Sequence, residues 1–211
     1  MNSREVILEK IRSGLGRTSG QPVPPPPPVR IAIPDVPVEQ RIQTMFEKIE
    51  ALAGKTYLAA SKEGARDYVA KLVEGRDGVC SNDPFLSECG ITALPNIASG
   101  LTDREELRAH CATRAVGVTS ATYTLSDTGT LVMMFGEAEA RLVSLLPPVH
   151  CAVVPRQRIL TGLDEFLSLH PQPVEDRSST VFITGPSRTA DIEQILVRGV
   201  HGPGEIHVVV V

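Results

Sequence analysis

The sequence lacks a run of apolar residues long enough to span a bilayer, which argues against a transmembrane helix. It also lacks a strong charge of one sign: 25 acidic and 21 basic residues leave a net charge of −4. That balance argues against a nucleic-acid-binding surface as the main function. The amino terminus carries mixed charge and no apolar segment of the kind found in signal peptides. We therefore expect a cytoplasmic protein with no membrane span and no nucleic-acid partner.

Cysteine is scarce, and no two cysteines form a C-x-x-C pair. The four are Cys80, Cys89, Cys111 and Cys151. Such spacing supplies neither a zinc site nor a set of ligands for an iron–sulfur cluster. We predict buried thiols that act as small hydrophobic side chains, and no cofactor or metal bound by this chain. A G-x-G-x-x-G motif after a strand is absent as well, so no nicotinamide or flavin site is evident.

The body of the chain alternates between helix-like and strand-like segments. Residues 38–52 have apolar positions at helical spacing, 56–60 read as a strand, and Ser61 caps a second helix before the short strand 78–80. This alternation predicts an α/β fold with a mostly parallel sheet. At 211 residues, the chain is long enough for one sizeable core plus an appendage.

The appendage is the first 37 residues. Ser3 to Leu15 reads as a short amphipathic helix, and the proline run 24–28 behind it must be an extended polyproline segment. A stiff spacer is the favoured interpretation of that run, ahead of a motif for a proline-reading domain. We therefore predict two parts: residues 1–37, a helix plus linker, and residues 38–211, an α/β domain. The sequence leaves open whether the helix docks on its own core, on a second copy or on a partner.

The last stretch reads as strand, helix, strand. Thr180 to Thr184 is a β-branched run stopped by Gly185-Pro186, a helix is expected from Ser187 or Thr189, and residues 206–211 read as a strand covered on both faces. Two parallel strands joined by a helix make a right-handed crossover. A helix that opens with Ser187, Arg188 and Thr189 offers backbone N–H groups, hydroxyls and a cation to a carboxylate or phosphate. The alternative, which spacing alone favours, is a plain cap with Arg188 solvated.

A second loop, Ser126 to Thr130, lies between two predicted strands. It is either a hairpin turn or a ligand loop at the mouth of the sheet. Because ligands of open α/β sheets bind beyond the carboxyl ends of the strands, we expect this loop and the one after Thr184 to converge on a pocket for a small anion. The groups available there for proton transfer are Asp127, Asp191 and His201. The predicted ligand-binding residues are Thr128, Gly129, Thr130, Gly185, Ser187, Arg188 and Thr189.

Three stretches together resemble the LUD-domain family, and within it the lactate utilization protein C branch. They are Gly117-Val-Thr119 running into Ser126-Asp-Thr-Gly-Thr-Leu131, then Arg141-Leu-Val-Ser-Leu-Leu-Pro-Pro-Val-His150, and Thr184-Gly-Pro-Ser-Arg-Thr-Ala-Asp-Ile-Glu193 with Gly199-Val-His-Gly-Pro203. The polyproline segment is outside the family pattern, and Ser126 stands where the family more often has a small apolar residue. The family supplies no catalytic residue to carry over.

The resemblance implies a three-layer α/β/α sandwich, similar to that of glucosamine-phosphate deaminases, ribose-phosphate isomerases and CoA transferases. It also implies a role as one component of a cytoplasmic system that oxidises L-lactate to pyruvate, with the iron–sulfur clusters carried by partner proteins. Two alternatives stay open. One is a free-standing enzyme acting on a phosphorylated or CoA-linked small molecule, by fold analogy. The other is a structural adaptor of the complex.

Overall fold

A computed structural model describes residues 3–16, 18, 21–22, 25, 33–136, 141–172, 177–190 and 196–211. The chain divides into two compact units, residues 1–30 and 31–211. The first unit contains the predicted helix, α1 (Ser3–Gly14), in which the side chains of Ile7 and Ile11 are more than half exposed. None of the helices in the described part of the chain has the length and apolar character needed to cross a membrane.

Six parallel strands form the central sheet of the second unit, in the order β1-β12-β7-β4-β2-β3. Their bounds are β1 Lys55–Leu58, β2 Gly78–Cys80, β3 Ile97–Ala98, β4 Val116–Ser120, β7 Val149–Val154 and β12 Glu205–Val210. The prediction that the last strand is covered on both faces is confirmed, because three successive residues, Val208, Val209 and Val210, are at most 1% exposed. A β-branched run without polar interruption suits such a central position.

One face of this sheet is covered by α3 (Lys62–Leu72) and α4 (Pro84–Glu88), whose apolar residues pack on alternate residues of β4, β7 and β12. Ser61 caps α3 as predicted, since its hydroxyl oxygen accepts a hydrogen bond from the Gly64 N–H at 3.2 Å. The other face is covered by α2 (Val38–Ala51), α5 (Arg104–Thr113), α6 (Leu142–Leu145) and a second, smaller sheet. The fold is therefore the predicted α/β/α sandwich with an added sheet.

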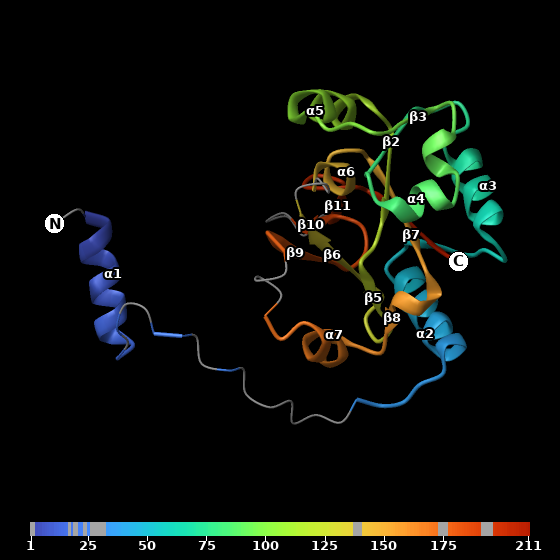
Figure 1. Ribbon diagram of the computed structural model, residues 1–211. Helices are drawn as coiled ribbons and strands as arrows, with labels where there is room; N and C mark the ends of the chain where they lie inside the picture. Colours follow the sequence, from blue (N-terminus) through green and yellow to red (C-terminus); the bar gives the residue numbers. More distant parts are fainter. Residues whose placement is uncertain are drawn as a thin grey trace. The chain divides into compact units, whose positions relative to one another are not determined.

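The second sheet has four strands in the order β8-β5-β6-β9. Their bounds are β5 Tyr123–Leu125, β6 Thr130–Phe135, β8 Ile159–Leu160 and β9 Ser179–Ile183. Strand β6 is buried on both faces. Its residues Leu131, Met133 and Phe135 join the core under α2, whereas Val132 and Met134 pack around Phe166 of α7 (Leu163–Leu169). Figure 1 shows this sheet across the core from α3.

Close packing of α6 on β4 depends on one glycine. A Cβ atom on Gly117 would lie 1.9 Å from the carbonyl oxygen of Val143, so any side chain there would displace backbone. The other elements of this unit are two short 3-10 helices, η1 (Ile91–Ala93) and η2 (Arg156–Arg158), and a carboxyl-terminal hairpin. Asp103 caps α5, since its carboxylate accepts a hydrogen bond from the Glu106 N–H at 2.8 Å.

The predicted strand–helix–strand unit at the carboxyl end is wrong. Strand β9 belongs to the small sheet, antiparallel to β6, so it does not pair with β12. Where the helix was expected to begin, Arg188–Ala190 forms β10, which pairs antiparallel with β11 (Leu196–Arg198); residues 191–195 lie outside the described part. Backbone pairing between the two ends of the segment overrides the helical spacing of its apolar residues.

Candidate functional site

The two loops predicted to form a site do meet. The hydroxyl groups of Thr130 and Thr184 lie 2.7 Å apart, and that of Thr128 lies 2.8 Å from Thr130. The loop rests on α2, because a Cβ on Gly129 would come within 3.0 Å of Ile49, and the glycine adopts φ +68°. A residue with a side chain would be strained in that conformation. The threonine hydroxyls thus satisfy one another across the two loops.

The segment after Thr184 turns onto the end of the same helix. Gly185 has φ +82°, and a Cβ there would lie 3.1 Å from Leu52. The Arg188 guanidinium donates a hydrogen bond to the Leu52 carbonyl oxygen, and Ser187 accepts one from the His201 backbone N–H at 3.3 Å. Thr189 lies in β10, opposite Val197 of β11. Because this segment is a hairpin, the predicted anion site at a helix start is not formed.

Of the three predicted proton-transfer residues, the structure describes Asp127 and His201, and it gives no contact between them. Asp127 packs against Gly162, where an added Cβ would lie 2.6 Å from Asp127 Oδ2, and it accepts a hydrogen bond from the Thr128 hydroxyl at 3.2 Å. His201 is exposed in the loop before β12. Asp191 lies outside the described residues. The loops therefore anchor α2 to the small sheet, and neither of the two cavities below is lined by them.

A cavity of about 1170 Å³ opens instead at the carboxyl ends of β2 and β3. The loops that follow these strands form one wall, and α5, α6 and the end of β6 form the other. This is the edge of an open parallel sheet where ligands bind. The lining residues are Asn82, Asp83, Pro84, Ser87, Thr92, Ser99, Gly100, Leu101, Thr102, Arg104, Leu107, Phe135, Gly136, Arg141, Leu142, Leu145 and Ser178.

A second hollow of about 240 Å³ adjoins the first and shares Asp83 with it. Arginine side chains line it on two sides. The guanidinium of Arg158 is held by the Ser120 hydroxyl and the Ala121 carbonyl oxygen, each at 3.3 Å from Nη1, and Arg177 precedes β9. The other lining residues are Thr122, Tyr123 and Met134. Two guanidinium groups beside a small hollow suit a carboxylate, which arginine binds with two parallel hydrogen bonds.

Next to this hollow, Tyr123 brings a titratable partner. Its hydroxyl lies 3.1 Å from Nε2 of His170, at the end of α7. Both rings pack on Phe166, with centroid distances of 5.9 Å and 5.3 Å. The imidazole and phenol therefore stand close enough to exchange a proton through one hydrogen bond.

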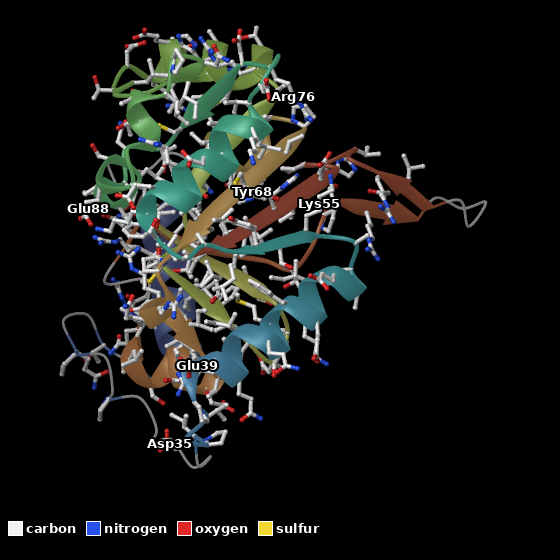
Figure 2. The ribbon with its side chains drawn as sticks, turned by 90° about the vertical axis from the view of Figure 1, so that its right-hand side faces the viewer. Asp35, Glu39, Lys55, Tyr68, Arg76 and Glu88 are labelled. Carbon is white, nitrogen blue, oxygen red and sulfur yellow. The ribbon has the colours of Figure 1, made fainter. Side chains whose placement is uncertain are left out.

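A second polar cluster lies at the opposite, amino-terminal end of the sheet. His207 of β12 is 4% exposed, and its ring nitrogens lie 2.7 Å from the Tyr68 hydroxyl of α3 and 2.7 Å from Glu205. Burial lowers the pKa of His207, although the hydrogen bond to Glu205 opposes this, and burial raises the pKa of Tyr68 to about 12. Glu205 also pairs with Lys55 of β1 (Figure 2). The charges of Lys55 and Arg76 lower the pKa of His207 further, and its ring bridges α3 and β12 through the two hydrogen bonds.

His150 and the four cysteines are further titratable groups buried in the core. His150 of β7 is fully buried, its Nε2 lies 2.8 Å from the Thr119 hydroxyl, and burial lowers its pKa to about 4. The four cysteines are buried singly, as predicted, and burial raises the pKa of the Cys80, Cys89 and Cys111 thiols to about 11 and that of Cys151 to about 12. The absence of an iron–sulfur cluster from this chain stays a prediction.

Residues 82–100 contain helix breakers and show neither a helical nor a strand period, so none of the cavity residues there was predicted. The available signal was positional. Asn82 and Asp83 come two and three residues after β2, and Ser99 follows β3 directly, so the carboxyl ends of both strands already carry polar side chains. Arg141 stood in the family motif, but only packing of α6 on β4 brings it to the same edge.

Comparison with known proteins places the chain in a family. The model of the LUD domain matches residues 42–211. Lactate utilization protein C 1 of Bacillus mycoides is 29% identical over 96% of this chain and 94% of its own length, and lactate utilization protein C of Bacillus subtilis is 28% identical over 96% and 93%. Lactate utilization protein C of Halalkalibacterium halodurans is 34% identical over 67% of this chain and 65% of that protein, just under two thirds of it.

The fold has a solved counterpart. A crystal structure of a DUF162 family protein from Deinococcus radiodurans superposes with a TM-score of 0.62 at 18% identity, covering 83% of this chain and 99% of the other. At that identity the likeness concerns the fold alone. From the domain match and the relatives together, the chain belongs to the LUD domain family.

Proposed function

We propose that this chain is a component of a cytoplasmic, iron–sulfur-dependent system that oxidises L-lactate to pyruvate. The observation that carries the proposal is the near full-length similarity to two proteins named for lactate utilization, those of Bacillus mycoides and Bacillus subtilis. Similarity along the whole chain, rather than in one motif, supports a shared role. The iron–sulfur clusters of the system would reside in partner proteins.

The geometry offers a place for the substrate. Oxidation of lactate removes two electrons and two protons, and needs a cation for the carboxylate and a base near the hydroxyl. The hollow beside Asp83 has Arg158 and Arg177 for the carboxylate, with Tyr123 and His170 at its margin. In this scheme His170 takes the hydroxyl proton by way of Tyr123, the Cα–H bond breaks, and the second proton and the two electrons of that bond would pass to an acceptor in the partner proteins.

The proposal is tested by capture of the tagged full chain from its own cytosol, followed by an iron assay and by lactate-driven reduction of a dye. Iron-bearing partners with lactate-dependent dye reduction are the expected result. A single colourless protein without activity would contradict membership in the complex.

Variants locate the substrate within the complex. Arg177→Ala should capture the same iron-bearing partners but lose lactate-driven reduction, because one cation for the carboxylate is gone. Arg108→Ala is the matched control, since Arg108 is an exposed arginine of α5 that lines neither cavity. Unchanged dye reduction by Arg177→Ala would remove the hollow from the reaction. Arg188→Ala and Asp127→Asn, introduced in the same way, test the loops predicted from the sequence.

One observation favours a second candidate, a free-standing enzyme that acts on a phosphorylated or CoA-linked small molecule. The larger cavity, at about 1170 Å³, exceeds the 300–1,000 Å³ or so typical of sites for drug-sized ligands, and lactate is far smaller than such ligands. Turnover of a compound of this class by the isolated chain would favour that candidate.

A further inference from the structure

The large cavity is built for a ligand that lactate does not resemble. Its wall combines two arginines, a row of hydroxyl and amide groups, and an apolar side formed by Leu107, Leu142, Leu145 and Phe135. A small 2-hydroxy acid would leave the apolar side exposed to water. The three kinds of lining therefore require a ligand with an anionic group, a polar body and an apolar part.

The two arginines are held at one edge by helix packing. Arg104 is the first residue of α5, and Arg141 immediately precedes α6. These helices pack on each other through Cys111 and Val143, which fixes the spacing of their amino-terminal ends. A guanidinium presents a rigid fork of donors that matches the oxygens of a phosphate group and keeps its charge at every physiological pH. This edge is therefore suited to the phosphate of the ligand.

Three neutral groups of the lining, those of Asn82, Ser99 and Ser178, donate hydrogen bonds to backbone carbonyl oxygens. The hydroxyl hydrogen of Ser99 is donated to the Thr92 carbonyl at 3.0 Å, and that of Ser178 to the Phe135 carbonyl at 2.9 Å. The amide of Asn82 donates to the Leu101 carbonyl at 2.9 Å. The hydroxyl donors of Ser99 and Ser178 are committed to backbone, and Asn82 keeps one N–H, so these three groups offer a ligand mainly oxygen lone pairs. The body of a matching ligand must supply O–H or N–H groups, as a sugar ring does.

The carboxylate in the lining does not oppose this. Oδ1 of Asp83 accepts a hydrogen bond from the Phe85 N–H at 2.8 Å at the start of α4, and Asp83 stands where the large cavity adjoins the small hollow. Arg104 and Arg141 come from the other wall. Anion recognition and the acidic group thus belong to different sides of the cavity.

From these three features we infer that the large cavity binds a phosphate ester of nucleotide size. Its phosphate lies at Arg104 and Arg141, its sugar hydroxyls face Asn82, Ser99 and Ser178, and its ring lies against the leucine wall. The inference does not depend on the lactate-oxidising role, since it concerns a ligand of the chain itself.

The test is calorimetric titration of the purified full chain with adenosine monophosphate, uridine monophosphate and flavin mononucleotide, and with inorganic phosphate and adenosine as the two halves of the ligand. At least one nucleotide should bind more tightly than inorganic phosphate and adenosine. Arg104→Ala and Arg141→Ala should each weaken binding of that nucleotide by roughly 10-fold or more, because each removes charge-assisted hydrogen bonds to the phosphate.

Arg108→Ala is the control within the same helix α5, and it should bind the nucleotide as the wild type does. Both Arg104 and Arg141 are exposed, so their truncation should leave the thermal unfolding of the protein unchanged. The inference is overturned if no nucleotide binds more tightly than phosphate, or if both cavity variants bind it with wild-type affinity. Lactate-driven activity of the captured complex is a separate readout, so either proposal can fail alone.

Discussion

A single methyl group at Gly117 probes how tightly the layers of the fold are packed. In the middle of β4, a Cβ atom would lie 1.9 Å from the Val143 carbonyl oxygen and 3.1 Å from Cγ of Pro147. Backbone atoms cannot rotate away as a side chain can, so either α6 or β4 must move. We predict that Gly117→Ala destabilises the protein by about 1–3 kcal/mol, the usual cost of overpacking a core.

Gly64→Ala is the matched comparison. This glycine lies in α3, and its added Cβ would meet Ala59 at 3.8 Å and the Ser61 hydroxyl at 3.9 Å, which are ordinary contacts. Alanine in a helix is favoured over glycine by roughly 0.5–1 kcal/mol. Both substitutions restrict the unfolded chain alike, so the two variants should differ by about 1.5–4 kcal/mol in unfolding free energy.

Urea unfolding of the full chain, followed by circular dichroism, measures this difference. For a protein of this size, each kcal/mol shifts the midpoint temperature by about 2–4 °C, so a thermal melt should show the same order. The reasoning is refuted if Gly117→Ala unfolds at the same urea concentration as Gly64→Ala.

Three further outcomes are expected. Burial tends to raise the pKa of Glu165, but hydrogen bonds from Thr161 and the charge of Arg41 outweigh it and hold that pKa below its usual range. The stability that the ionised Glu165 contributes is therefore complete above the unfolded pKa of about 4.3, and it is lost as pH falls through the lower pKa of the folded state. In urea titrations, the unfolding free energy of the wild type should therefore drop more steeply in acid than that of Glu165→Gln. The four buried thiols should resist a thiol reagent at pH 8 until urea unfolds the chain; rapid labelling of the native protein would contradict their burial. A double-mutant cycle with Thr130→Val and Thr184→Val should give a coupling of about 0.5–1.5 kcal/mol in unfolding free energy, and additive effects would mean that the hydroxyls do not share a hydrogen bond.

Local chemistry decided the parts of the fold that could be predicted. Ser61 caps α3 because the chain before it is extended and its hydroxyl reaches the Gly64 N–H. The valines of β12 form a central strand because such a run is stable only when both faces are covered. The cap depends on a contact three residues away in the sequence, and the valine strand depends on burial rather than on one specific partner.

Distant contacts decided the parts that could not be predicted. Arg188 is in a strand because it lies opposite Arg198, and Gly199 donates its N–H to the Ser187 carbonyl, so the two ends of the segment hold each other in a hairpin. The spacing of apolar residues within the segment does not reveal such pairing. The cavity is similar, since Arg104 and Arg141 line one cavity only after α5 and α6 pack on the same face of the sheet.

The two outer strands of the central sheet have a consequence for assembly. Strand β3 has two residues and β1 has four, and in the described chain each pairs on one side only. Such short edge strands offer few unpaired backbone N–H and C=O groups for pairing with a strand of another molecule, and Lys55 places a charge at the start of β1. The sheet is thereby protected from growing into a polymer by strand addition, even though its interior is rich in valine.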